Sequence, residues 1–126
     1  KNDYILDFKN NLLCYKNIAI YKVDLSLFNY DYMTENGVKL REFDFLYKQH
    51  TIKDLSFEYI TKIGNIECYT YRNDDILINV DRKYVDMLDN KIIYDIKGLT
   101  NRSVIEVCNS ITNDRVAYIM PVVRKC

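Results

Sequence analysis

Histidine, glycine, proline and tryptophan are scarce in this chain of 126 residues, and their scarcity argues against several kinds of chemistry. The chain has one histidine, three glycines, one proline and no tryptophan. Gly37, Gly64 and Gly98 are isolated from one another, so the sequence offers no glycine-rich loop for a phosphate. The only histidine, His50, has no nearby serine or cysteine motif that would form a nucleophile–base pair. We therefore predict that the protein has no catalytic residues and is not an enzyme.

The cysteines lack the spacing of a metal site. Cys14, Cys68, Cys108 and Cys126 form neither a CxxC nor a CxxH motif, which structural zinc sites require. We expect no metal and no other cofactor. Four cysteines permit two disulfides, but cysteines this sparse, in a chain long enough for a core, favour free thiols in a reducing compartment. The expected location is therefore intracellular: the cytoplasm, the nucleoid or a site of viral replication.

Long apolar runs and an excess of one charge are also missing. No stretch approaches the ~20 apolar residues of a membrane helix, so we expect no membrane segment. Eighteen basic and eighteen acidic residues give a formal net charge of zero. Proteins that grip nucleic-acid phosphates directly usually carry a basic surplus. No repeat or linker breaks the sequence, so we expect residues 1–126 to form a single domain. The first residue is not methionine, which leaves open an excised fragment of a longer chain.

What the chain does have favours strands. Twelve tyrosines, together with frequent isoleucine and valine, are typical of sheets. Alanine, the best helix former, occurs only at Ala19 and Ala117. The predicted fold class is α+β: β-dominated, with a mainly antiparallel sheet and one or two short helices. The abundance of asparagine, aspartate, isoleucine, lysine and tyrosine also indicates an AT-rich genome, as in viruses, phages, protozoa or low-GC bacteria.

The first half of the chain gives an incomplete pattern. Strands are predicted at residues 5–8, 12–23 and 56–62. Asn10-Asn11 and Asn36-Gly37 mark turns, because these residue types tolerate a positive φ. Residues 24–32 favour neither a helix nor a strand.

Two stretches fit both the helical period of 3.6 residues and the strand period of two residues. Residues 40–47 place apolar side chains at helical spacing and also at alternate positions. Thr51 and Asp54 resemble a capping box ahead of a helix, yet Leu55, Phe57 and Tyr59 alternate as in a strand. Periodicity alone does not decide such cases. We favour a strand for residues 56–62.

The second half is clearer. Strands are predicted at residues 66–71, 76–80, 92–97, 103–108 and 116–123. Asn73-Asp74-Asp75 forms a turn, and Asp81 is the predicted N-cap of a helix through Leu88, in which Tyr84 and Met87 lie on the apolar side. Short polar turns join the last three strands, so these strands should form an antiparallel meander.

The C-terminal segment is continuously apolar from Ala117 to Val123 and contains the only proline, Pro121. Proline removes a donor from the ladder, so Pro121 should lie at a sheet edge or where the strand ends. Two interpretations remain open. The segment is a core strand that ends at the proline, or Met120, Pro121 and Val122 line a groove, where a pliable methionine suits peptide binding.

Two motifs near the C-terminus resemble a known family. The first is Ala117-Tyr118-Ile119-Met120-Pro121-Val122, with Arg124 close behind. The second is Ile78-Asn79-Val80 followed by Tyr84-Val85-Asp86-Met87-Leu88. Together with the order strand, helix and three strands, they resemble the last half-domain of bacterial-type DNA sliding clamps over residues 75–123. Residues 1–74 show no such resemblance.

The resemblance implies a ring that encloses duplex DNA and a C-terminal strand that captures client peptides of polymerases. It implies that Ile119, Met120, Pro121 and Val122 belong to the peptide pocket, whereas Arg82 and Lys83 face DNA. A neutral net charge suits a ring, because closure rather than phosphate contacts would retain the DNA.

The sequence therefore predicts a non-enzymatic binding or assembly module, with a clamp-like DNA processivity domain as one specific form. The alternative is a viral or parasite interaction domain that docks a partner on exposed tyrosine-rich strands and contains disulfides, since tyrosine is favoured at interfaces. The expected partners are proteins, within an oligomer or larger complex, with duplex DNA only in the clamp-like form.

Overall fold

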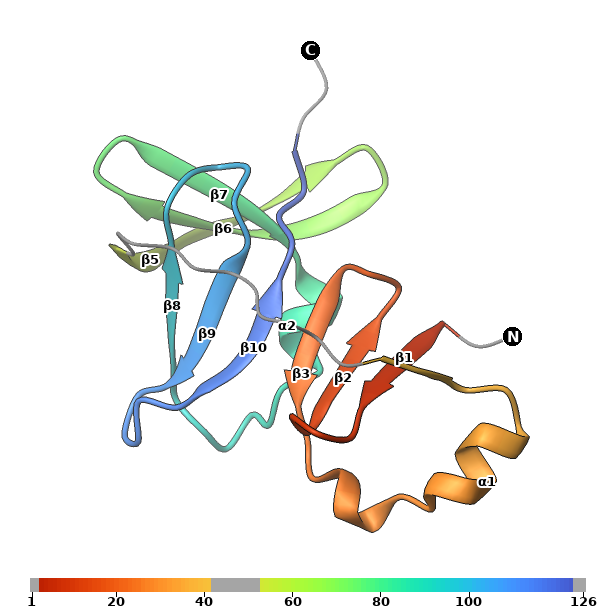
Figure 1. The fold of residues 1–126 in the computed structure, drawn as a ribbon. Helices are drawn as coiled ribbons and strands as arrows, with labels where there is room; N and C mark the ends of the chain where they lie inside the picture. Colours follow the sequence, from red (N-terminus) through yellow and green to blue (C-terminus); the bar gives the residue numbers. More distant parts are fainter. Residues whose placement is uncertain (1–2, 42–52, 124–126) are drawn as a thin grey trace. The chain divides into compact units, whose positions relative to one another are not determined.

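The computed structural model describes residues 3–41 and 53–123. The chain divides into two compact units, unit 1 (Lys1–Lys48) and unit 2 (Gln49–Cys126); the bar in Figure 1 locates them along the sequence. Strands dominate, most of them pair antiparallel, and two short α-helices are present, which confirms the predicted α+β fold class. Whether residues 1–126 fold as one domain stays a prediction. None of the helices in the described ranges is long and apolar enough to cross a membrane.

Unit 1 is a small sheet followed by two short helical segments. Its elements are β1 (Tyr4–Asp7), β2 (Leu12–Tyr15), β3 (Ala19–Lys22), the 3-10 helix η1 (Leu25–Leu27), α1 (Tyr30–Glu35) and β4 (Lys39–Leu40). β1, β2 and β3 pair antiparallel in chain order, and β4 lies parallel to β1 on its other side. The predicted strand at residues 5–8 and the turn that follows it are confirmed.

The prediction of one strand over residues 12–23 was wrong. The chain reverses at Lys16 and Asn17, which have φ values of 54° and 58°, and the Ile18 amide donates to the Tyr15 carbonyl at 3.0 Å. Two successive positive φ values suit a tight hairpin, and residues 16–18 form the three-residue loop between Tyr15 of β2 and its partner Ala19 of β3. The turn was missed because lysine gives no turn signal and apolar residues flank it on both sides.

Side-chain caps explain the segment whose pattern was unclear. Asp24 accepts a hydrogen bond from the Ser26 amide at 3.1 Å at the start of η1. Asn29 accepts one from the Tyr32 amide at 2.8 Å at the start of α1. Such caps satisfy amides that have no partner within the helix. α1 ends at the predicted Asn36-Gly37 turn, where Gly37 has a φ of +78°.

Unit 2 is a six-stranded antiparallel arrangement with one helix. Its elements are β5 (Lys53–Ile63), β6 (Ile66–Asn73), β7 (Ile76–Asp81), α2 (Arg82–Asp86), β8 (Tyr94–Gly98), β9 (Ile105–Asn109) and β10 (Arg115–Ile119). Neighbouring strands follow the order β10-β9-β8-β5-β6-β7. The predicted strands of the second half, the helix after Asp81 and the final meander are confirmed. The helix ends at Asp86 and the last strand at Ile119, both earlier than predicted.

Strand β5 changes neighbours along its length. Lys53–Leu55 pairs with β8, whereas Ser56–Ile63 pairs with β6 on the opposite edge. Asp54 therefore lies in a strand and caps no helix, so the preference for a strand was right. Thr51 and most of residues 40–47 lie outside the described residues.

A β-bulge interrupts β5. Phe57 lies opposite Tyr71 while Tyr59 lies opposite Thr70, so β5 contains one extra residue between them. Successive strand residues point to opposite faces. Phe57 and Tyr59 therefore lie on different faces, although simple alternation predicts one face for both.

The core of unit 2 is aliphatic. Ile78, Val80, Ile105, Val107 and Ile119 are fully buried. Gly98 fits closely in this core, because a Cβ atom there would lie 2.7 Å from Cδ1 of Ile78 and 3.0 Å from Cδ1 of Leu55, and these side chains would have to shift.

The cysteines inside the described ranges are thiols. Cys14, Cys68 and Cys108 are buried and form no disulfide, and burial raises the pKa of the Cys14 and Cys108 thiols. Cys126 lies outside the described residues.

Candidate functional site

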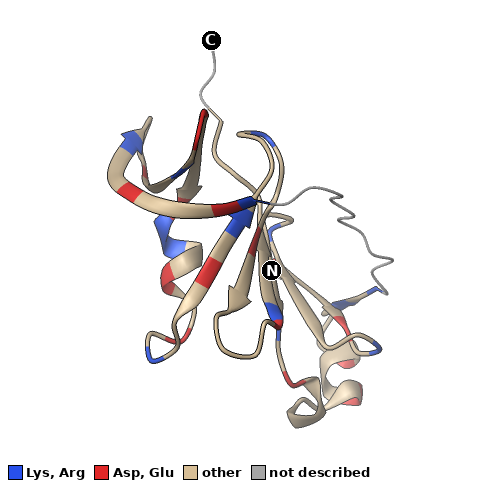
Figure 2. Ribbon diagram, turned by 90° about the vertical axis from the view of Figure 1, so that its left-hand side faces the viewer, with Lys and Arg blue, Asp and Glu red and all other residues tan. Residues whose placement is uncertain are grey.

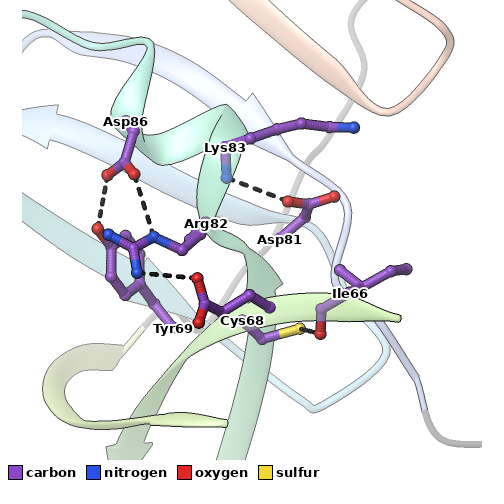
Figure 3. A network of polar contacts seen from close by, with 8 residues as sticks. Ile66, Cys68, Tyr69, Asp81, Arg82, Lys83 and Asp86 are labelled. Carbon is purple, nitrogen blue, oxygen red and sulfur yellow. Dashed lines mark hydrogen bonds and ion pairs between the residues drawn. The ribbon is translucent and has the colours of Figure 1, made fainter. Parts of the chain in front are cut away.

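Helix α2 is fixed to strand β6 by a polar network around Arg82 (Figure 3). The Asp81 side chain accepts from the Lys83 amide at 3.0 Å, which caps the helix directly after β7. Arg82 Nη1 lies 3.0 Å from Oε1 of Glu67, and Arg82 Nε lies 3.2 Å from Oδ2 of Asp86. The Tyr69 hydroxyl donates to Oδ1 of Asp86 at 2.5 Å. The Arg82–Glu67 ion pair and the Tyr69–Asp86 hydrogen bond thereby hold the helix to strand β6.

The electrostatics of this network follow from those contacts. The guanidinium of Arg82 lies over the Tyr69 ring, 5.1 Å from its centroid. The hydrogen bond to Asp86, with burial, raises the pKa of the Tyr69 hydroxyl. The same carboxylate raises the pKa of Arg82. Tyr69 and Arg82 thus keep their neutral and charged forms, respectively, as part of the scaffold.

The two residues predicted to face DNA have different surroundings. Arg82 is engaged by Glu67, Asp86 and the Tyr69 ring. Lys83 is exposed, with its ammonium 5.3 Å from the centroid of the Tyr84 ring. Acidic and basic residues are interspersed along the ribbon of unit 2 (Figure 2). A contact between these two residues and DNA stays a prediction, and for Arg82 it would compete with two ion pairs.

Beside this network lies an open hollow of about 360 Å³ with aromatic walls. Its rings are Phe57 of β5, Tyr69 and Tyr71 of β6, and Tyr94 of β8. Phe57 meets Tyr69 and Tyr71 edge to face, with ring centroids 5.8 and 6.1 Å apart. This geometry is favourable for aromatic pairs and leaves the exposed Phe57 ring available for further contact. We call this hollow the aromatic hollow.

Tyr71 forms the buried part of the aromatic hollow. Burial, and then the neighbouring Tyr69 and Asp86, raise the pKa of its hydroxyl. Tyr71 therefore stays neutral throughout the ordinary pH range and contributes a ring rather than an acid or a base.

A second hollow, of about 410 Å³, adjoins the first along α2 and shares Val85, Leu88 and Tyr94 with it. The charged residues that line the two hollows are all aspartates: Asp54, Asp86, Asp89 and Asp95. Lys97 lies 3.5 Å from Asp54, and Arg82 pairs with Asp86. Within residues 3–41 and 53–123, no ion pair compensates Asp89 or Asp95. The rim of the hollows is therefore acidic.

The predicted pocket residues at the C-terminus are divided between core and surface. Ile119 is fully buried, whereas Met120 is exposed and Pro121 and Val122 are half-buried. The Val122 amide donates to the Asn79 carbonyl at 2.8 Å, which places the segment beside β7. Ile119 is thus a core side chain. Partner binding by Met120, Pro121 and Val122 stays a prediction.

Other candidate sites find no support within the described residues. In those ranges no group of three or more histidine, cysteine, aspartate or glutamate side chains is placed to hold a metal ion. His50 lies outside them. The sequence pointed to tyrosine-rich strands in general, but it did not assign the aromatic hollow, whose rings come from three strands. Tyr69 and Tyr71, at alternate positions of one strand, were the available signal.

No protein-family model, curated protein or solved structure matches the chain.

Proposed function

We propose that the protein is a non-enzymatic binding module and that the aromatic hollow receives a segment of a partner protein. The observation that carries this proposal is the set of four aromatic rings around one open hollow. Tyrosine and phenylalanine are enriched in the centres of interfaces, where they bury large areas at a low cost in side-chain entropy. A hollow of this volume accommodates side chains of a peptide.

Exposed apolar side chains on β5 also indicate that a partner binds at the aromatic hollow. Phe57, Tyr59 and Ile60 are 55%, 45% and 47% exposed. Isolated exposed apolar residues are ordinary, but a cluster on one strand indicates an interaction site. Phe57 and Ile60 lie opposite Tyr71 and Tyr69, so they share the face of the aromatic hollow. A partner would remove these side chains from water.

Binding can be tested with peptides selected from a displayed random library against the whole chain. Peptides that use the aromatic hollow should lose at least tenfold in affinity for Phe57→Ala, because truncation of a ring at an interface costs more than about 1.4 kcal/mol. Ile111→Ala is the matched control, since Ile111 is 90% exposed in the β9–β10 turn. Titration calorimetry measures both affinities. Equal affinities for Phe57→Ala and the parent protein would overturn the proposal.

A second candidate is the clamp-like DNA processivity domain. It is supported by the order of β7, α2, β8, β9 and β10 and by the position of Met120, Pro121 and Val122 beside β7. In this form, the double variant Met120→Ala/Pro121→Ala should bind client peptides less tightly while its thermal unfolding is unchanged.

Duplex DNA provides the other test of this candidate. Lys83→Ala should weaken binding to a fluorescent duplex in an anisotropy titration at low salt, whereas Lys91→Ala, also exposed, should not. The clamp-like candidate fails if the parent protein leaves the anisotropy of the duplex unchanged.

A further inference from the structure

We infer that the segment received by the aromatic hollow is a basic β-strand of a partner protein that adds to the open edge of β5. This inference rests on the proposed function and specifies the kind of partner. It combines the pairing of β5, the direction of its side chains and the charge around the hollow.

The open edge results from the change of neighbours along β5. Beyond Leu55, β5 pairs only with β6, and within the part of the chain that the structure describes no strand pairs with its other edge. In an antiparallel strand, alternate residues direct their N–H and C=O groups to opposite edges. Residues 56–63 therefore present backbone donors and acceptors away from β6. An added strand satisfies such groups with regular hydrogen bonds.

This edge lacks most of the features that protect an edge strand from pairing. Protected edges are short or contain proline or charged side chains. β5 is eleven residues long, has no proline and exposes Phe57, Tyr59 and Ile60. Its Glu58 is paired with Arg72 at 3.3 Å. Two protective features remain, the exposed Lys62 and the bulge before Tyr59, and the bulge leaves regular pairing over residues 59–63.

The side chains on the open edge direct the partner into the aromatic hollow. The bulge places Phe57 and Ile60 on the same face as Tyr69 and Tyr71. An added strand would point every second side chain to that face, toward the rings, and the others to the opposite face. Strand addition thus explains why Phe57 and Ile60 are exposed on the face of the aromatic hollow.

Charge complementarity specifies the partner as basic. Four aspartates line the two hollows, and Asp89 and Asp95 have no compensating ion pair within residues 3–41 and 53–123. Lysine or arginine side chains would meet these carboxylates at the rim, and their cations are also attracted to exposed aromatic faces. An acidic strand would be repelled by the same carboxylates.

The test compares four versions of one synthetic peptide in which lysine alternates with valine. The first is unmodified and the second has norleucine in place of lysine. The third and fourth have N-methyl groups on alternate backbone nitrogens, each in one of the two possible registers. Calorimetry gives the affinity, and amide chemical-shift changes give the binding surface. We expect the lysine peptide to shift the amides of residues 56–63 and to bind at least tenfold more tightly than the norleucine peptide.

N-methylation tests the pairing itself. Only one edge of an added strand faces β5, so N-methyl groups at alternate residues should abolish binding in one register and spare it in the other. On the protein, Asp95→Asn and Asp89→Asn should each weaken binding severalfold, whereas Asp75→Asn, in the exposed β6–β7 turn, should not. Unchanged thermal unfolding of the variants excludes a folding defect.

The outcomes separate the inference from the proposed function. Equal affinity of the lysine and norleucine peptides overturns the basic partner, and equal effects of N-methylation in both registers overturn strand addition. If library-selected peptides depend on Phe57 but the lysine peptide does not bind, the inference fails while the proposed function stands. If no peptide depends on Phe57, the proposed function itself fails.

Discussion

Strands β9 and β5 of unit 2 have similarly apolar sequences but opposite surroundings. β9 has five residues, of which Ile105, Glu106, Val107 and Cys108 are buried. β5 has eleven residues, of which only Leu55 is buried. β9 has β8 and β10 along its two edges, whereas β5 has one neighbour at a time along most of its length. Of these two strands, the one flanked on both edges is buried and the one with a single neighbour at a time is exposed.

The largest expected effect is in the buried strand. Ile105→Ala should lower the free energy of unfolding by about 2–5 kcal/mol, because it removes methyl groups from a fully buried position and leaves a cavity. Urea denaturation followed by circular dichroism measures this change. A loss of less than about 1 kcal/mol would show that the site collapses around the smaller side chain.

The next effect concerns the buried carboxylate of β9. Glu106 is almost fully buried and its Oε1 accepts a hydrogen bond from Nε of the half-exposed Arg115 on β10. Arg115→Met should cost about 2 kcal/mol of stability, because it removes the guanidinium from an ion pair whose carboxylate is buried. Adding Glu106→Gln to that variant should recover part of the loss, since the amide carries no charge. Urea denaturation of the single and double variants checks the sign of this coupling.

Alkaline pH should lower the free energy of unfolding through Tyr71 of β6, which lies opposite Phe57 of β5. Burial raises the pKa of Tyr71 in the folded state, while the unfolded tyrosine titrates near pH 10. The unfolded state therefore loses its proton first, and this contribution to stability is complete below pH 10 and falls as pH rises further. One tyrosine gives a slope of about 1.4 kcal/mol per pH unit.

The control for this prediction is Tyr71→Phe, which lacks the titrating hydroxyl. Its free energy of unfolding, measured in urea between pH 9 and pH 11, should fall less steeply than that of the parent protein. Cysteine titration contributes equally to both proteins. Parallel pH profiles would contradict the assignment of the slope to Tyr71.

The smallest effect is expected for an isoleucine-to-alanine substitution in the exposed strand β5. Ile60→Ala should cost less than about 1 kcal/mol, mostly through β-propensity, because nearly half of the side chain already contacts water. Urea denaturation alongside Ile105→Ala gives the matched comparison. A cost as large as that of Ile105→Ala would mean that β5 is buried in solution, for example between two copies of the chain.

Local signals predicted most elements of unit 2. Ile76, Ile78 and Val80 alternate, and Asp81 caps the helix that follows them, so neighbours in sequence contained the necessary information. The Lys16-Asn17 turn and the bulge in β5 were not predicted. Each depends on how two strands twist and pair, and neither leaves a clear pattern in one strand.

The candidate site was harder to predict, because distant residues assemble it. From the sequence alone, Arg82 was expected to be available to DNA, but Glu67 of the preceding hairpin forms an ion pair with it. Ile119 reads as part of an apolar segment with two interpretations, and burial against other strands places it in the core. Tyr94 joins Phe57 in one hollow only because β5 and β8 are neighbours.

The sequence by itself determined the class of fold, the positions of most strands in unit 2 and the absence of familiar catalytic motifs, because propensity, alternation and caps act between residues close in the chain. The tertiary structure decided which edge of β5 stays open, which charges are paired and where the aromatic rings meet. Those features depend on pairing between strands far apart in sequence. Such contacts form, and contribute to stability, only when the chain has folded.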